Sequence, residues 1–144
     1  MTFTILLLLV VAASIGYAPR TLAQDWGAFE APCAVTYKVT GQWGAQFAAQ
    51  IALTNLSAPL DGWTLGWVFP GGQRITQLAN GEYAQNQAVV TVTNGAWNRA
   101  LRSGQRTIIA FQANAGGAHP TEFVLNGAPC EFETVHSAPI FWRP

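Results

Sequence analysis

Charged side chains are scarce in this chain of 144 residues: only 10% are Asp, Glu, Lys or Arg, and the formal net charge is zero. Soluble domains usually carry about 25% charged residues, so amides, hydroxyls and glycine have to supply most of the polar surface. Without a basic patch, the chain lacks the electrostatic attraction that binding to nucleic acid or anionic lipid requires. The composition favours an uncharged, polyhydroxylated partner instead, because amides bond hydroxyl groups without the desolvation cost of a charge.

A helical repeat is also missing. Apolar spacing of three and four residues never persists for the length of a helix. Short alternating stretches, separated by turn-forming residues about every ten positions, are typical of a β-sandwich. The length of the chain allows one domain. We therefore predict a single all-β, antiparallel β-sandwich of immunoglobulin-like or jelly-roll type.

The strongest strand signal lies at residues 63–69, between two turn-rich stretches. Its alternate positions carry only large apolar side chains, namely Trp63, Leu65, Trp67 and Phe69. A strand sends alternate side chains to one face, and burial of such a face removes a large apolar area from water. We therefore predict that this strand is central and that both of its tryptophans are structural.

The same alternation predicts the other strands. In chain order they cover residues 34–40, 47–55, 73–78, 88–94, 107–112 and 121–125. Val39 is expected to face the core together with Val35 and Tyr37. Residues 80–86 are expected to form a polar connection, and residues 131–144 an apolar C-terminal tail without a strand.

The first residues have the features of a signal peptide. Residues 3–15 form an apolar run that is too short to span a bilayer comfortably. The small side chains of Thr21 and Ala23 predict cleavage after residue 23, which leaves Gln24 at the mature N-terminus. An uncleaved anchor is the alternative, because no Lys or Arg precedes the run. Cleavage makes the domain a secreted protein free of the membrane, with residues 24–32 as a leader.

Cysteine is limited to Cys33 and Cys130, near the two ends of the mature domain. In an exported protein such a pair is expected to form a disulfide, and two buried free thiols are the alternative. Closing a loop of this length contributes about 4 to 5 kcal/mol by the chain-entropy account. His119 and His136 have no Cys or His neighbours at ligand spacing, so we expect neither a metal nor a cofactor.

Several short motifs occur in a specific order and spacing between residues 33 and 130. They are Cys33-x-Val35-x-Tyr37, Gln42-Trp43-Gly44-x-x-Phe47, Thr54-Asn55, Gly62-Trp63-Thr64-Leu65, Phe69-Pro70, Val90-Thr91-Val92-Thr93-Asn94, Trp97-Asn98, Phe111 and Phe123-x-Leu125-Asn126-Gly127-x-x-Cys130. Each motif alone is a weak signal. Taken together, this part of the chain resembles the family-two carbohydrate-binding modules, which are the bacterial-type cellulose-binding domains.

The resemblance implies a sandwich of about nine strands whose ends are joined by the two cysteines. Such modules bind insoluble cellulose, and some bind chitin or xylan, through a row of exposed tryptophans. The positions that match this row are Trp43, Ala79 and Trp97, so the middle ring is absent, and nearby Tyr83 is a candidate substitute. The predicted carbohydrate-binding residues are Trp43, Trp97, Gln77, Gln112 and Asn98.

Trp43 and Trp97 lie in turn contexts rich in Gly, Ala, Gln and Asn, which favours exposure over core packing. A flat indole covers the apolar face of a pyranose ring, while amides bond its hydroxyls. We therefore predict a secreted, monomeric, non-catalytic module that binds an insoluble β-linked polysaccharide. The alternatives are a structural or protein-interaction sandwich with a decayed sugar site, and a component of a glycoside hydrolase system.

Catalysis has little support in the sequence. Glycoside hydrolysis needs two carboxylates about 5 to 10 Å apart across one cleft. The candidate acids are scattered along the chain and do not pair: Asp61, Glu82, Glu122, Glu131 and Glu133. No Ser-His-Asp arrangement stands out either, so we predict that the chain is not an enzyme.

Overall fold

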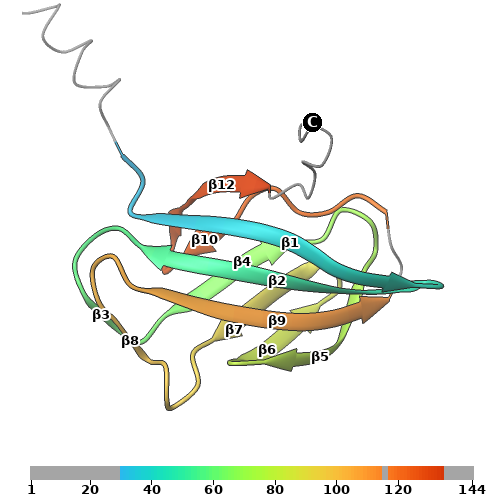
Figure 1. Cartoon of the computed structure of the whole chain (residues 1–144), viewed down its shortest axis with the longest axis horizontal. Helices are drawn as coiled ribbons and strands as arrows, with labels where there is room; N and C mark the ends of the chain where they lie inside the picture. The colour runs from blue at the N-terminus through green and yellow to red at the C-terminus, as the bar shows by residue number, and fades with distance from the viewer. Residues whose placement is uncertain (1–29, 115–116, 135–144) are drawn as a thin grey trace, which may run out of the picture. The chain divides into compact units, whose positions relative to one another are not determined.

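The alternating stretches form strands in the computed structural model, which describes residues 30–114 and 117–134 (Figure 1). The strands within these residues are β1 (Cys33–Trp43), β2 (Gln46–Asn55), β3 (Leu60–Asp61), β4 (Thr64–Val68), β5 (Arg74–Ala79), β6 (Glu82–Asn86), β7 (Val89–Thr93), β8 (Ala100–Leu101), β9 (Arg106–Asn114), β10 (Val124–Leu125), β11 (Ala128–Pro129) and β12 (Glu131–Thr134). No helix among the described residues is long and apolar enough to cross a membrane. The predicted signal peptide of residues 1–23 lies outside them.

Two five-stranded sheets lie one behind the other in Figure 1. One sheet has the strand order β12-β1-β2-β9-β5 and the other β11-β10-β4-β7-β6, while β3 pairs with β8 separately. The pairings described are antiparallel, except that β12 runs parallel to β1. The predicted all-β sandwich is confirmed. Its described part has twelve strands instead of about nine, and four of them are only two residues long.

The core lies between the two sheets. The predicted inward residues of the central strand are all buried: Trp63, Leu65, Trp67 and Phe69. The Trp67 ring packs against Phe111 of the facing sheet, with ring centroids 5.8 Å apart, and against Phe123 at 5.5 Å. Aromatic contacts at these separations hold the two layers together. The structural role predicted for Trp63 and Trp67 is confirmed.

Two local details differ from the predictions. Val39 keeps the parity of Val35 and Tyr37, since it pairs with the buried Ala49, but it is 37% exposed at the position just before the bulge between Val39 and Gly41. Residues 82–86 form strand β6 at the edge of the second sheet, where a polar connection was expected. Most of this edge strand is exposed, so it lacks the apolar alternation by which strands are recognised.

The C-terminal tail begins as a strand that the sequence did not predict. β12 extends the first sheet beyond Cys130, and its Phe132 ring stacks on Phe123 with centroids 5.6 Å apart. The disulfide Cys33–Cys130 joins the start of β1 to the residue just before β12, so the free-thiol alternative is excluded. The apolar tail residues from 135 onward lie outside the described residues.

A histidine in the loop before β10 gives the fold a pH dependence. The Tyr37 hydroxyl lies 2.9 Å from Nδ1 of His119, whose ring also packs edge-on against Phe47. Burial lowers the pKa of the His119 imidazole and raises the pKa of the Tyr37 phenol above its usual range. The folded chain therefore keeps His119 neutral at a pH where the unfolded chain binds a proton.

Stability is accordingly expected to fall as the pH drops below the usual imidazole pKa of about 6.5, and to level off below the lowered pKa of the folded state. The measurement is the urea midpoint at pH 8 and at pH 5, for wild type and for His119→Gln, which does not titrate. The variant should lose less stability over this interval. An equal loss in both proteins contradicts the assignment.

Candidate functional site

The outer face of the β1–β2–β9–β5 sheet carries small residues and amides in rows that cross the strands. In one row Gly41 pairs with Ala48, Ala48 with Gln112, and Gln112 with Gln77. Gln77 and Gln112 are exposed, and no hydrogen bond of their side chains occurs among the described residues. Since alternate residues of a strand share a face, these amides point to solvent together and are available to a ligand.

Trp43 lies at the end of β1 with 46% of its surface exposed. Its indole Nε1–H donates to Oε1 of Gln46, its partner on β2, at 2.8 Å. The ring lies over Gly41, where an added Cβ would be 3.1 Å from the ring atom Cζ3. The absence of a side chain at Gly41 therefore lets the indole lie down along the sheet.

Trp97 lies in the loop between β7 and β8 and is 71% exposed. Its ring lies over Gly95 in the same manner, since a Cβ added there would be 2.6 to 2.8 Å from three carbons of the indole. Real Cβ atoms do not approach a ring so closely, so only glycine permits this ring position. Each exposed indole thus lies over a glycine two residues earlier in the chain.

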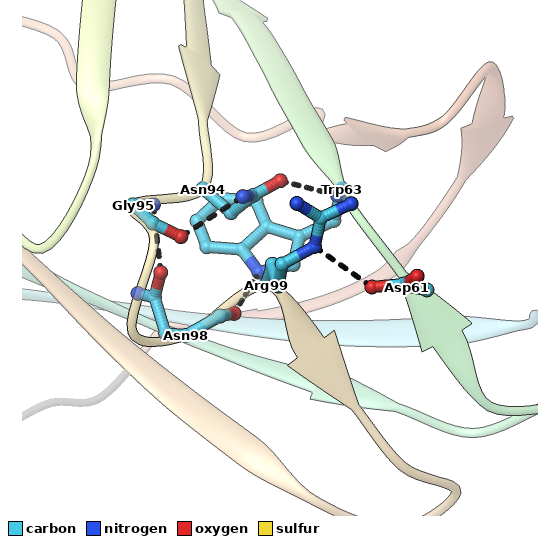
Figure 2. A network of polar contacts seen from close by, with 6 residues as sticks. All are labelled: Asp61, Trp63, Asn94, Gly95, Asn98 and Arg99. Carbon is cyan, nitrogen blue, oxygen red and sulfur yellow. Dashed lines mark hydrogen bonds and ion pairs between the residues drawn. The ribbon is translucent and has the colours of Figure 1, made fainter.

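The Trp97 loop is fixed to the core tryptophan Trp63, as Figure 2 shows. The Trp63 backbone N–H donates to Oδ1 of Asn94 at 2.8 Å, and its indole N–H donates to the carbonyl of Asn98 at 2.8 Å. The Gly95 N–H donates to Oδ1 of Asn98 at 2.7 Å. The loop that carries the exposed ring is therefore held at several points, which limits the entropy lost on binding.

Asn98 also ties this loop to the first sheet. Its Nδ2 donates at 2.9 Å to the carbonyl of Asn80, the residue after β5. Trp43 belongs to the opposite end of the sheet, because its partner Gln46 pairs with Asn114 at the end of β9. Both Oδ1 and Nδ2 of Asn98 form hydrogen bonds within the protein, which favours a role in positioning the loop. Direct sugar contact by Asn98 stays a prediction.

Tyr83, the candidate substitute for the missing middle ring, does not lie on the outer face. Tyr83 pairs with the buried Val92, so it lies on the side of β6 that faces the core, and its hydroxyl donates to the Ile75 carbonyl at 3.3 Å. The missing middle ring is therefore not replaced by Tyr83 on the outer face.

Among the acids that were considered for catalysis, Asp61 forms an exposed ion pair with Arg99 at 2.8 Å.

Two features of the site were missed in the sequence. Gly41 and Gly95 position the exposed rings, and the repeated spacing Gly-x-Trp at residues 41–43 and 95–97 is a signal that points to them. Gln50 lies on the same outer face, opposite Ala110 of β9. It was missed because nothing within β2 distinguishes it from other outward residues.

Exposed indoles and uncharged amides on a rigid β-sandwich define a class of protein, the non-catalytic carbohydrate-binding modules. Residues 33–130 match the family described as cellulose binding domain, and the chain belongs to this family. The predicted family, its sandwich fold and its class as a non-catalytic binding module are thereby confirmed.

Similar proteins of known activity are much longer than this chain. It is 41% identical over 101 residues to endoglucanase CelA of Streptomyces lividans, with 68% of this chain and 22% of that enzyme covered. Exoglucanase A of Cellulomonas fimi is 36% identical over 124 residues, with 84% of this chain and 14% of the enzyme covered. The chain therefore spans less than a quarter of the length of either relative.

Solved structures give the same fold. The chitin-binding domain of Chi18aC from Streptomyces coelicolor is 27% identical with a TM-score of 0.59, covering 68% of this chain and 93% of that domain. The family-two cellulose-binding domain of ScLPMO10C is 24% identical with a TM-score of 0.53, covering 72% of this chain and 98% of that domain. At that identity the second likeness supports the fold alone.

Proposed function

We propose that this chain binds an insoluble β-linked polysaccharide through Trp43 and Trp97, with Gln77 and Gln112 bonding sugar hydroxyls. The observation that carries the proposal is the position of Trp97, which is 71% exposed yet held by an anchored loop and laid over Gly95. A large apolar ring presented to water gains free energy when a flat apolar surface covers it. The C–H face of a pyranose ring is such a surface.

The strands of the outer face do not supply the acids that hydrolysis needs. Strands β2, β9 and β5, which form most of the face, contain no carboxylate. The chain itself then has no catalytic role on this face, because hydrolysis of a glycoside needs a pair of carboxylates. Cellulose and chitin are the first polysaccharides to test, since relatives are named as glucanases and one similar domain as chitin-binding.

The domain is proposed to act outside the cell as a secreted monomer. The apolar run of residues 3–15 and the disulfide Cys33–Cys130 support export, since disulfides persist in oxidising compartments.

The test is retention of the folded domain on microcrystalline cellulose and on chitin beads, measured as the fraction removed from solution. Wild type is expected to bind at least one of the two. Val89→Ser, which changes an exposed apolar residue of the second sheet, should bind as wild type does. If wild type stays in solution with both solids, the proposal is wrong.

Gly95→Ala is expected to weaken retention about five-fold, because the new methyl group displaces the Trp97 ring and part of its stacking is lost. Gly41→Ala is the matched comparison, where the nearest ring atom is 3.1 Å away and a small shift relieves the contact. Its effect should be smaller. Adsorption isotherms give the affinities, and urea unfolding shows whether either variant is merely destabilised. Equal affinity of Gly95→Ala and wild type contradicts the positioning role.

A further inference from the structure

We propose that residues 135–144 bind back onto this chain, in an apolar hollow at Gly66 on the outer face of the second sheet. This sheet, with the order β11-β10-β4-β7-β6, is not the one that carries Trp43, Gln77 and Gln112. The inferred contact is therefore separate from the proposed polysaccharide site and does not depend on it.

The Gly66 hollow lies between strands β4 and β7 and the loop that precedes β10. Its volume is about 480 Å³, within the roughly 300 to 1,000 Å³ usual for sites that hold a ligand. Gly66 pairs with Thr91 on one side and Val124 on the other, and its lack of a side chain deepens the face there. Val68 and Val89 pair across the hollow and are 57% and 51% exposed. Such exposed aliphatic groups gain free energy when an apolar group covers them.

The residues that follow β12 have the composition to cover this surface. Residues 135–144, which lie outside the described residues, read Val-His-Ser-Ala-Pro-Ile-Phe-Trp-Arg-Pro. Ile140, Phe141 and Trp142 are consecutive large apolar side chains, and each gains free energy when it leaves water. The segment contains no acid, and Arg143 follows the apolar triplet directly.

The described contacts bring the start of this segment close to the hollow. Thr134, the last residue of β12, pairs with Tyr37, whose hydroxyl lies 2.9 Å from Nδ1 of His119. His119 lines the hollow. Residues 135–139 precede the triplet, and at about 3.3 Å per extended residue they span about 17 Å. Two packed sheets are roughly 10 Å apart, so the triplet is within reach of the outer face of the second sheet.

The same stretch of chain already packs beside the hollow. Phe132 of β12 stacks on Phe123 with ring centroids 5.6 Å apart. Glu122 and Val124, the neighbours of Phe123 in the chain, both line the hollow. Residues 135–144 therefore continue a contact that begins within the described residues.

The charges on the two sides are complementary. Glu122 is exposed, and it is the charged residue that lines the hollow. The strands of the second sheet supply one further charged residue, Glu82, and no Lys or Arg. The cations of the described strands all belong to the first sheet: Lys38, Arg74 and Arg106. When the triplet lies in the hollow, Arg143 thus meets a carboxylate without a competing cation from these strands.

Nuclear Overhauser measurements on the folded chain test the contact. The ring protons of Phe141 and Trp142 should show cross-peaks to the methyl groups of Val68, Val89 and Val124. Cross-peaks to Val39 or Trp43 in their place would put the segment on the first sheet and overturn the proposal. The proposal is also wrong if cross-peaks are absent, or if a mixture of labelled and unlabelled chains shows that they arise between two molecules.

The rate of chymotrypsin cleavage after Phe141 and Trp142 measures how tightly the segment is held, because only the released segment is cut. Val68→Ser/Val89→Ser should raise this rate about ten-fold through the loss of apolar contact, whereas Leu56→Ser, an exposed aliphatic residue outside the hollow, should not. Glu122→Arg should raise the rate about two- to five-fold, and Glu82→Arg should leave it unchanged. Residues 33–130 should stay uncut in every variant. Equal cleavage rates in Val68→Ser/Val89→Ser and Leu56→Ser overturn the proposal.

Discussion

Trp97→Ala is expected to weaken binding to the insoluble polysaccharide by about ten-fold or more, since one stacked aromatic ring is worth roughly 1 to 3 kcal/mol. The indole is 71% exposed, so its removal takes away ligand contact and little core packing. Trp43→Ala should have a smaller effect, because its ring is 46% exposed and its N–H is engaged by Gln46. Adsorption isotherms on the solid that wild type binds best measure both effects.

Two controls separate lost contact from lost structure. The urea midpoint of Trp97→Ala should stay close to that of wild type, because the loop remains fixed through Trp63, Asn94 and Asn98. Trp97→Phe should recover part of the affinity, since a smaller ring still covers a sugar face. A Trp97→Ala variant that binds as tightly as wild type excludes this ring as a ligand contact.

Parity along the strand is the reason that the tryptophans could be assigned from sequence. Trp63 and Trp67 alternate with small or polar residues inside an apolar strand, and both are buried in the structure. Trp43 and Trp97 stand among turn residues, and both are exposed. The two-residue alternation along a strand separates buried from exposed tryptophans even when the order of the strands in the sheet is unknown.

The elements that were missed depend on neighbours that sequence alone does not name. Strand β6 is recognised only by its hydrogen bonds to β7, because its own residues do not alternate in hydropathy. Strand β12 pairs in parallel with β1 and begins directly after the disulfide-bonded Cys130. Val39 shares the parity of the buried residues of β1 but is exposed just before a bulge, and sequence patterns give no sign of that bulge.

A hollow of about 170 Å³ in the outer face at Ala79 shows the same limit for the site. Its floor comes from Ala48, Ala79 and Ala110, which belong to three strands and meet only when the sheet order and register are known. The resemblance identified the absent ring at one of these positions. It did not identify which side chains would surround the space.

Removal of the disulfide is expected to have the largest effect on stability. Cys33 and Cys130 are 97 residues apart, and a closed loop of this length is worth about 4 to 5 kcal/mol in the chain-entropy account. That amount is a large share of the 5 to 15 kcal/mol that holds a typical domain folded. The double variant Cys33→Ala/Cys130→Ala should therefore unfold at a much lower urea concentration, with part of the population unfolded near body temperature.

The position of the Cys33–Cys130 disulfide predicts which part of the domain becomes unstable first when the disulfide is removed. Cys130 directly precedes β12, whose contact with the rest of its sheet is the parallel pairing with β1. Amide hydrogen exchange in the double variant should therefore accelerate first in residues 131–134 and in their β1 partners, and later in β4. Wild type treated with a reductant should behave as the variant does. A loss below about 1 kcal/mol, or uniform exchange across both sheets, would mean that the pairing of β12 with β1 holds without the covalent link.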